Sequence, residues 1–172
     1  TQFEEHLLDA TNAWAHYVDD AAALAGVPDD VLAEARAAAQ ADGRAGYKLT
    51  LRMPSFLPVI QYAHDRALRR LVHEAYSTRA SDLSAHPEWD NAPLVGRILA
   101  LRREAAQLLG YGNYAQVSLV PKMAQNPDEV IAFLRDLARR AKPFAERDFA
   151  GLADFARDEL GLAELMPWDV AY

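Results

Sequence analysis

Asn126-Pro127-Asp128-Glu129 begins the longest stretch of helical periodicity in this sequence, and this stretch decides the fold class. Asparagine is a favoured N-cap, proline suits the first helical position, and acidic residues in the first turn complement the helix dipole. Apolar residues then recur every three or four positions as far as Leu160, which is the spacing of one helix face. Pro143 lies inside this stretch, and we expect it to kink or divide the helix because proline cannot donate the interior hydrogen bond.

The same kind of pattern extends over most of the chain, so we predict a mainly α fold. Further helices are expected over residues 2–14, from Pro28 to a stop at Gly43, over residues 65–81, from Asn91 to Gly110, and briefly after Asn113. Glycine is a common helix stop because it adopts left-handed backbone angles without strain. The sequence begins at Thr1 rather than methionine and enters a helical pattern at once. We therefore expect residues 1–172 to form a single helical segment of a larger protein.

One stretch, Tyr47–Arg52, alternates with a period of two and predicts a β-strand. Tyr47, Leu49 and Leu51 share one face, and Lys48, Thr50 and Arg52 share the other. Because a buried strand must pair its backbone groups, a second strand is needed close by. Residues 16–19 are the local candidate, so we predict one small two-stranded element that pairs about 16–19 with 47–52.

The composition excludes several classes of protein. Lys and Arg number 18 against 25 Asp and Glu, which gives a net charge of −7. This balance argues against binding to nucleic acid or to an anionic membrane surface, both of which need excess positive charge. There are no cysteines, which excludes disulfides, thiolate nucleophiles and cysteine-bound zinc. No signal peptide or membrane-spanning run is visible, so we expect a cytoplasmic protein.

His73-Glu74-Ala75-Tyr76-Ser77 is the stretch most similar to a metal site. It begins like the zinc-binding helix motif H-E-x-x-H, in which two imidazoles one turn apart hold the ion. The fifth residue is Ser77, so the second ligand is missing and we predict a histidine packed on a helix. His6, His16, His64 and His86 show no spacing that would pair them. We therefore predict no metal ligand in these residues.

No catalytic or cofactor-binding residue is predicted either. Neighbouring acids such as Asp29-Asp30 and Asp158-Glu159 point about 100° apart on a helix, so they fit solvated faces better than a shared proton. The chain contains no G-x-S-x-G elbow and no glycine-rich phosphate loop. Arg79 could meet a peptide carboxylate, but we favour an ion pair with Asp82 three residues on. We interpret Trp168-Asp169 as an aromatic anchor beside a polar turn residue.

Seven stretches, taken in order, resemble one known family. They are Pro54–Val59, Ala75–Asp82, Trp89–Asn91, Ile98–Arg102, Ala106–Tyr111, Lys122–Pro127 and Pro167–Tyr172. Together they are similar to bacterial members of the thimet oligopeptidase family of zinc metallopeptidases, and the resemblance covers essentially the whole chain. It implies a helical segment from the N-terminal half of a two-lobed, zincin-type peptidase whose deep channel admits short peptides.

The resemblance also implies where the chemistry lies. In the family, zinc is held by the two histidines of H-E-x-x-H and a downstream glutamate, and no position here matches any of them. We therefore expect zinc in the parent protein but none in this segment, which would be inactive and would form part of the channel wall. Its partners would be short peptides and the missing C-terminal half, and its uncovered faces would favour self-association. The competing interpretation is a stand-alone helical binding or scaffold module without catalytic activity.

Overall fold

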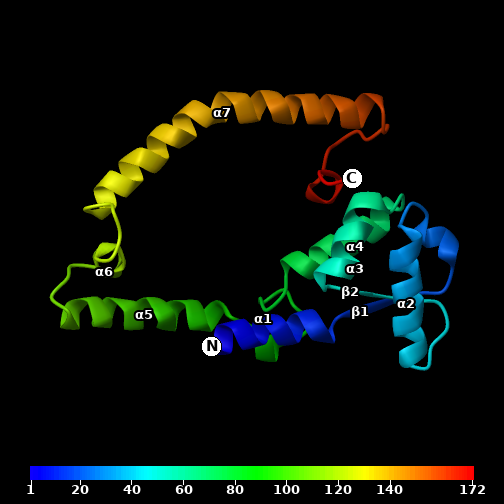
Figure 1. The fold of residues 1–172 in the computed structure, drawn as a ribbon, viewed down its shortest axis with the longest axis horizontal. Helices are drawn as coiled ribbons and strands as arrows, with labels where there is room; N and C mark the ends of the chain where they lie inside the picture. The colour runs from blue at the N-terminus through cyan, green and yellow to red at the C-terminus, as the bar shows by residue number, and fades with distance from the viewer. The chain divides into compact units, whose positions relative to one another are not determined.

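The computed structural model describes all residues from 1 to 172 (Figure 1) and divides them into two compact units. Unit 1 comprises residues 1–92 together with 165–172, and unit 2 comprises residues 93–164. The predicted fold class is confirmed, because helices dominate and the chain contains one two-stranded antiparallel sheet. None of the helices combines the length and the apolar character needed to cross a lipid bilayer.

The elements of unit 1 include four of the α-helices and both strands. In chain order they are α1 (Gln2–Ala13), β1 (Ala15–Val18), η1 (Ala21–Leu24), α2 (Asp29–Ala41), β2 (Tyr47–Thr50), α3 (Met53–Tyr62), α4 (Arg66–Ser77), η2 (Pro87–Trp89) and, after unit 2, η3 (Pro167–Asp169). Unit 2 contains α5 (Ala92–Leu108) apart from its first residue, α6 (Tyr114–Leu119) and α7 (Pro127–Asp158). The η elements are single 3-10 turns.

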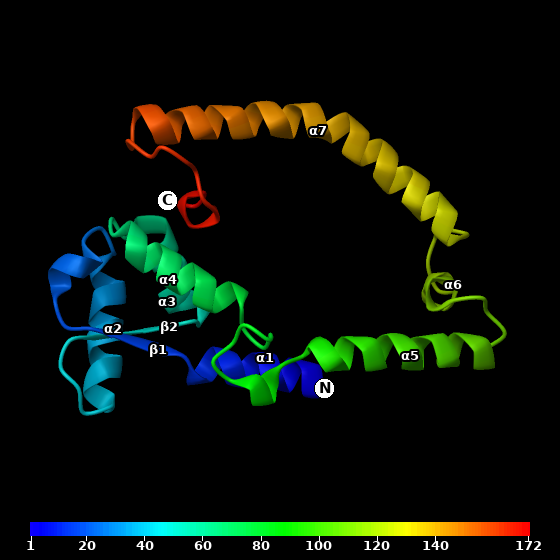
Figure 2. The same cartoon turned by 180° about the vertical axis from the view of Figure 1, so that it is seen from behind.

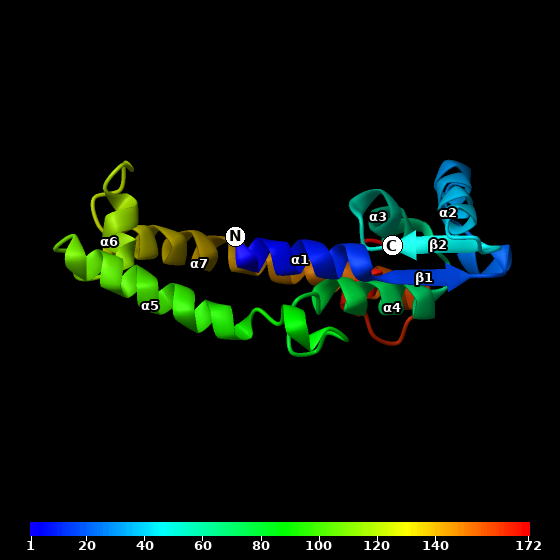
Figure 3. The ribbon, with the colours of Figure 1, turned by 90° about the horizontal axis from the view of Figure 1, so that it is seen from below.

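The two strands pair as the alternating pattern predicted, with Ala15 opposite Thr50 and Val18 opposite Tyr47. Figure 3 shows them side by side and antiparallel, with α2 and α3 over the same side of the ladder. The strand β2 is two residues shorter than expected. It ends at Thr50, whose N–H donates to the Ser55 hydroxyl at 2.9 Å, and α3 begins only three residues later.

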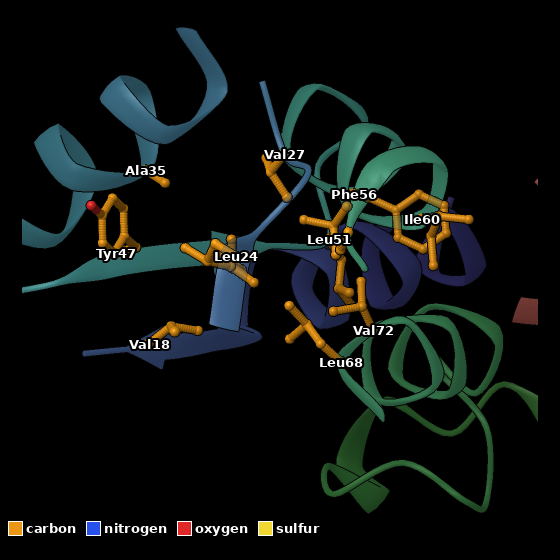
Figure 4. Packing of buried hydrophobic residues seen from close by; sticks show 13 residues of the cluster. Val18, Leu24, Val27, Ala35, Tyr47, Leu51, Phe56, Ile60, Leu68 and Val72 are labelled. Carbon is orange, nitrogen blue, oxygen red and sulfur yellow. The ribbon is translucent and has the colours of Figure 1, made fainter. Parts of the chain in front are cut away.

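A single hydrophobic core lies within unit 1 (Figure 4). The three residues predicted to share one face are all buried, with Tyr47 5% exposed and Leu49 and Leu51 each 1% exposed, although Leu51 lies just beyond the end of β2. Helices α3 and α4 contribute Val59 and Val72, neither of which is exposed at all. The alternation along β2 therefore directs its apolar side chains, Tyr47 and Leu49, into the core.

Close backbone contact at Gly26 helps to shape this core. Gly26 has a φ angle of +92°, and a Cβ there would overlap the Tyr62 carbonyl oxygen. The neighbouring Ala25 carbonyl accepts a hydrogen bond from the His64 N–H at 2.8 Å. Only glycine suits this position, because the backbone is left-handed there and no space is left for a side chain.

Helix α4 ends at Ser77, four residues before the predicted end. The Thr78 hydroxyl donates to the Glu74 carbonyl at 2.8 Å, and Ala80 adopts a positive φ of 50°. The Ala80 carbonyl then accepts from the Asn91 N–H at 3.0 Å. The Thr78 N–H also donates to the Glu74 carbonyl at 3.0 Å, so the regular hydrogen bonding of the helix reaches Thr78 and the chain leaves the helix at the positive φ of Ala80.

The longest helix, α7, starts where the sequence predicted. Asn126 is its N-cap and accepts from the Glu129 N–H at 2.9 Å. The helix is not divided at Pro143 but runs on as one element of 32 residues, and it changes direction along its length (Figures 1 and 2). Of the two outcomes expected for the proline, a bend without a break is the one observed.

Candidate functional site

His73 and Glu74 lie on α4, where neither is arranged to hold a metal ion. The His73 ring meets the edge of the Trp168 ring with 6.1 Å between centroids. The Glu74 carboxylate accepts from Arg70 Nε at 2.7 Å. One helical turn beyond His73 stands Ser77. The histidine is partly buried against an aromatic ring, in line with the packed histidine that the sequence predicted.

The remaining histidines are dispersed over unit 1. His6 is hydrogen-bonded to Asn91, His16 stacks on Trp14, His64 lies edge-on to Tyr172, and His86 contacts Glu88 and Trp89. No group of three or more histidine or carboxylate side chains is placed to hold a metal ion. As the structure arranges them, these donor groups do not form a zinc site.

The predicted ion pair between Arg79 and Asp82 is wrong. Arg79 Nη1 donates to the Thr11 hydroxyl at 2.8 Å, Nε donates to the Tyr76 carbonyl at 2.8 Å, and the guanidinium lies 3.5 Å from the Tyr76 ring centroid. The pair would need helical spacing from residue 79 to residue 82, but α4 has already ended at Ser77. Arg79 instead links α1 to the end of α4 through its hydrogen bonds to Thr11 and Tyr76.

The most elaborate polar cluster is one that the sequence did not predict, and it is centred on Asp169. This aspartate lies in η3, and its side chain is completely buried. Its carboxylate accepts from Arg66 Nη2 at 2.8 Å, from Arg66 Nε at 3.0 Å and from Arg69 Nη2 at 3.0 Å. It also accepts from the Met166 N–H at 3.0 Å. Figures 1 and 2 show η3 at the end of the chain beside α4.

Arg69 completes this cluster from the α4 side. It is only 2% exposed, and its guanidinium also donates to the Ala63 carbonyl at 2.7 Å and to the Trp168 carbonyl at 3.3 Å. The Tyr172 ring centroid lies 3.8 Å from the guanidinium carbon. A buried charge is tolerated when it is paired and its hydrogen bonds are made. Arg69 meets both conditions.

The charge state of Asp169 follows from these contacts. Burial by itself raises the pKa of the carboxyl group, but the hydrogen bonds from Arg66, the Met166 N–H and Arg69 outweigh it and leave the pKa below its ordinary value. Asp169 is therefore an ionised group whose oxygens are already occupied. Such a carboxylate is poorly suited to exchange protons with a substrate, and it is well suited to fixing η3 against α4.

We name Arg66, Arg69 and Asp169 the α4–η3 clamp. Its acid and its bases lie about 100 positions apart, with the whole of unit 2 between them, so no local pattern could pair them. One signal was available, because Arg69 stands between Leu68 and Val72 on the apolar side of α4. A charge at such a position must find a partner, although the sequence does not say which one.

Two surface grooves lie apart from the α4–η3 clamp. One, of about 390 Å³, lies within unit 1 between α1, α2, β2 and the start of α3. Its two basic residues are engaged already, Lys48 with Asp42 at 2.6 Å and Arg52 with Asn12 at 3.0 Å. The other, of about 450 Å³, lies within unit 2 beside α6 and the start of α7. Neither groove gathers a catalytic set of side chains.

Comparison with known proteins supplies the class. The model of peptidase family M3 matches residues 59–172, from the last part of α3 to the final residue. This range covers α4, unit 2 and η3, and therefore includes the α4–η3 clamp. The chain belongs to peptidase family M3.

The curated relatives are more specific. The chain is 51% identical to oligopeptidase A of Salmonella typhimurium over 172 residues, which is 99% of this chain and 25% of that protein. It is 43% identical to oligopeptidase A of Haemophilus influenzae and 37% identical to the probable cytosolic oligopeptidase A of Arabidopsis thaliana, again over 25% of each protein. The chain thus spans about a quarter of the length of the relatives that it matches.

Proposed function

We propose that this chain is a helical segment of a zinc-dependent oligopeptidase that hydrolyses short peptides, and that it forms part of the wall of the substrate channel. The observation that carries the proposal is the similarity to oligopeptidase A, which extends over 99% of the chain at 51% identity. The seven stretches quoted from the sequence lie within that match. Zinc and the groups that bind it would belong to other parts of the protein.

The surface of unit 2 supports a wall made of helices that other parts of the protein cover. Only two of its residues, Ala106 and Ala156, are buried. Large apolar side chains stand exposed instead, for example Leu99 at 59%, Leu108 at 81% and Phe133 at 66%. Exposed apolar surface on this scale marks an interaction site. Packed helices could then limit access to the catalytic centre by size, so that selectivity arises partly from steric exclusion.

The cellular location is part of the proposal. One relative carries the name cytosolic, while another from the same plant is named as an organellar oligopeptidase A. The bacterial relatives are more similar in sequence than either plant protein. The name of the cytosolic relative supports a cytoplasmic location for the whole protein.

A test requires the full-length gene product beside the isolated chain 1–172. The full-length protein is expected to contain one zinc ion per molecule and to hydrolyse a quenched fluorescent peptide in a chelator-sensitive manner. The isolated chain with added zinc should show no turnover above buffer. Hydrolysis by the isolated chain would place the catalytic centre in these residues and overturn the channel-wall role. A full-length protein without zinc or turnover would instead favour a helical binding or scaffold module.

A further inference from the structure

Helix α7 carries an exposed apolar stripe. Six large side chains on it, Phe133, Leu134, Leu137, Phe144, Phe149 and Phe155, are each between 52% and 66% exposed. At 100° per residue they fall within one side of the helix, and the charged residues Asp136, Arg139 and Asp154 fall on the other. Ala156 is the only buried residue of the helix. The stripe is therefore almost uncovered over the length of α7.

An acid stands in the middle of this stripe. Asp148 lies four residues after Phe144 and four before Leu152, which puts all three on one line along the helix. Its side chain is 70% exposed, and it contacts the neighbouring Arg147 at 3.2 Å. The Cα–Cβ bond of Arg147 lies about 100° further around the helix, but its guanidinium reaches back to Asp148 and lies 5.4 Å from the Phe144 ring centroid, and its side chain is 72% exposed. Both hydrogen bonds end on Asp148 Oδ1, and such an exposed pair contributes little stability, so Oδ2 is available to a further donor.

The length of the relatives indicates what covers the stripe. They are about four times as long as this chain, so most of the protein lies outside these residues. Burying the stripe would remove Asp148 from water along with its apolar neighbours. A buried carboxylate is tolerated only when an opposite charge and hydrogen-bond donors meet it. Arg147 supplies hydrogen bonds to one oxygen only, so an apolar covering surface with one basic group at the level of Asp148 would meet the other.

We infer that α7 docks through this stripe on a segment of the same polypeptide outside residues 1–172, and that this segment presents an arginine or lysine to Asp148. The inference rests on the proposed function, because it takes the chain to be one part of a longer peptidase. It goes beyond it by naming the helix face, the residue and the chemistry of the partner surface.

The test compares three variants of the full-length protein by hydrogen exchange of the α7 amides. Asp148→Leu should speed exchange by about a hundredfold or more, because it leaves the partner cation buried without its acid. Leu152→Asp, which puts an unmatched acid one turn on, should have a similar effect. Asp154→Asn, a matched control on the polar side, should leave exchange unchanged. In the isolated chain 1–172, Asp148→Leu should have no such effect, because the stripe is uncovered there.

Three results would overturn the inference. Unchanged or slower exchange in full-length Asp148→Leu would mean that no cation faces the residue. Equal effects of Asp148→Leu in the isolated and full-length proteins would mean that Arg147 is its only partner. A full-length dimer that loses α7 protection on dilution would make a second copy the occupant. Peptidase activity of the wild-type protein, measured separately, tests the proposed function without reference to α7.

Discussion

Replacing Asp169 by alanine would remove the acid of the α4–η3 clamp and leave Arg69 buried without a counter-charge. Arg69 is 2% exposed and Asp169 has no exposed side-chain surface, so water cannot replace the lost contact without movement. Loss of one partner from a buried pair costs about 3–5 kcal/mol. Undocking of residues 165–172 limits this cost, because release of η3 would return Arg69 to water.

After the Asp169→Ala change, η3 either stays docked on α4 or is released. Urea denaturation and hydrogen exchange together distinguish these two outcomes. Urea denaturation of the isolated chain, followed by far-UV circular dichroism, should show a loss of about 3–5 kcal/mol if η3 remains docked. If η3 is released, the loss is smaller and the amides of residues 165–172 become fast in hydrogen exchange. Asp158→Asn is the control, because this acid is 59% exposed and paired with Arg157. It should change stability by less than about 0.5 kcal/mol.

The pH dependence of stability is a second test of the α4–η3 clamp. The pKa of Asp169 is lower in the folded chain than its ordinary value, so the unfolded state binds the proton more readily. The stabilisation is complete above the unfolded pKa of about 3.9 and is lost as the pH falls through the folded pKa. Asp169→Asn, which cannot titrate, should therefore lose less stability between pH 5 and more acidic solution than the wild type. An Asp169→Ala variant with wild-type stability and wild-type exchange at residues 165–172 would refute the clamp.

Three other substitutions test the core, a backbone position and an exposed hydrogen bond. Leu49→Ala should lower the unfolding free energy by about 2–5 kcal/mol in urea denaturation, because this leucine is 1% exposed in the core of unit 1. Gly26→Ala should lower the melting temperature more than Gly43→Ala, because both have positive φ but only at Gly26 would the new Cβ meet other atoms within 4 Å. Asp42→Asn should lower the pKa of Tyr17 in an ultraviolet titration, because the Asp42 carboxylate accepts the Tyr17 hydroxyl at 2.6 Å and raises that pKa.

Each of these tests has an internal reference. Leu83 is 75% exposed, so Leu83→Ala should change stability by less than about 0.5 kcal/mol. A Leu49→Ala effect equally small would contradict the core. Equal melting temperatures for the two glycine variants would show that the backbone near residue 26 relaxes without cost. Tyr17→Phe identifies which tyrosine titrates, and an unshifted pKa in Asp42→Asn would contradict the hydrogen bond.

Local patterns predicted α1, α2, α4 and the strand pair of unit 1 because the physics behind them is local. Alternation in Tyr47–Leu51 decides which side chains of a strand share a face, and a strand next to helices must point its apolar face at them. The start of α7 at Asn126 was predictable for the same reason, since an N-cap acts on amides within three residues. The end of α4 was not, because the chain turns at Ala80, a non-glycine residue with a positive φ of 50° that no helix-stop pattern marks.

Long-range polar contacts could not be predicted in the same way. Arg79 was expected to pair with a neighbour, but its partner is Thr11, 68 positions away. Asp169 was interpreted as a turn residue, although it neutralises an arginine 100 positions away. A charge in an apolar pattern signals that a partner exists, because the unpaired ion would cost too much. The identity of that partner depends on the topology, which the pattern does not contain.

Asp148 and Asp169 are both aspartates, but the first is exposed and the second is buried. The contrast shows how the two units differ in what covers their side chains. Asp169 is buried because Arg66 and Arg69 meet it within unit 1, where apolar residues also cover one another. Asp148 stands on an apolar stripe of unit 2 that nothing in that unit covers, and its one contact is an exposed neighbour. An uncovered stripe of leucines and phenylalanines on α7 would carry an aggregation risk if the helix stood alone. An apolar surface with one cation at the level of Asp148 would bury the stripe and give the acid a second partner. Asp169 has its cations, Arg66 and Arg69, within this chain. For Asp148 we infer a cation of the same kind on a segment outside it.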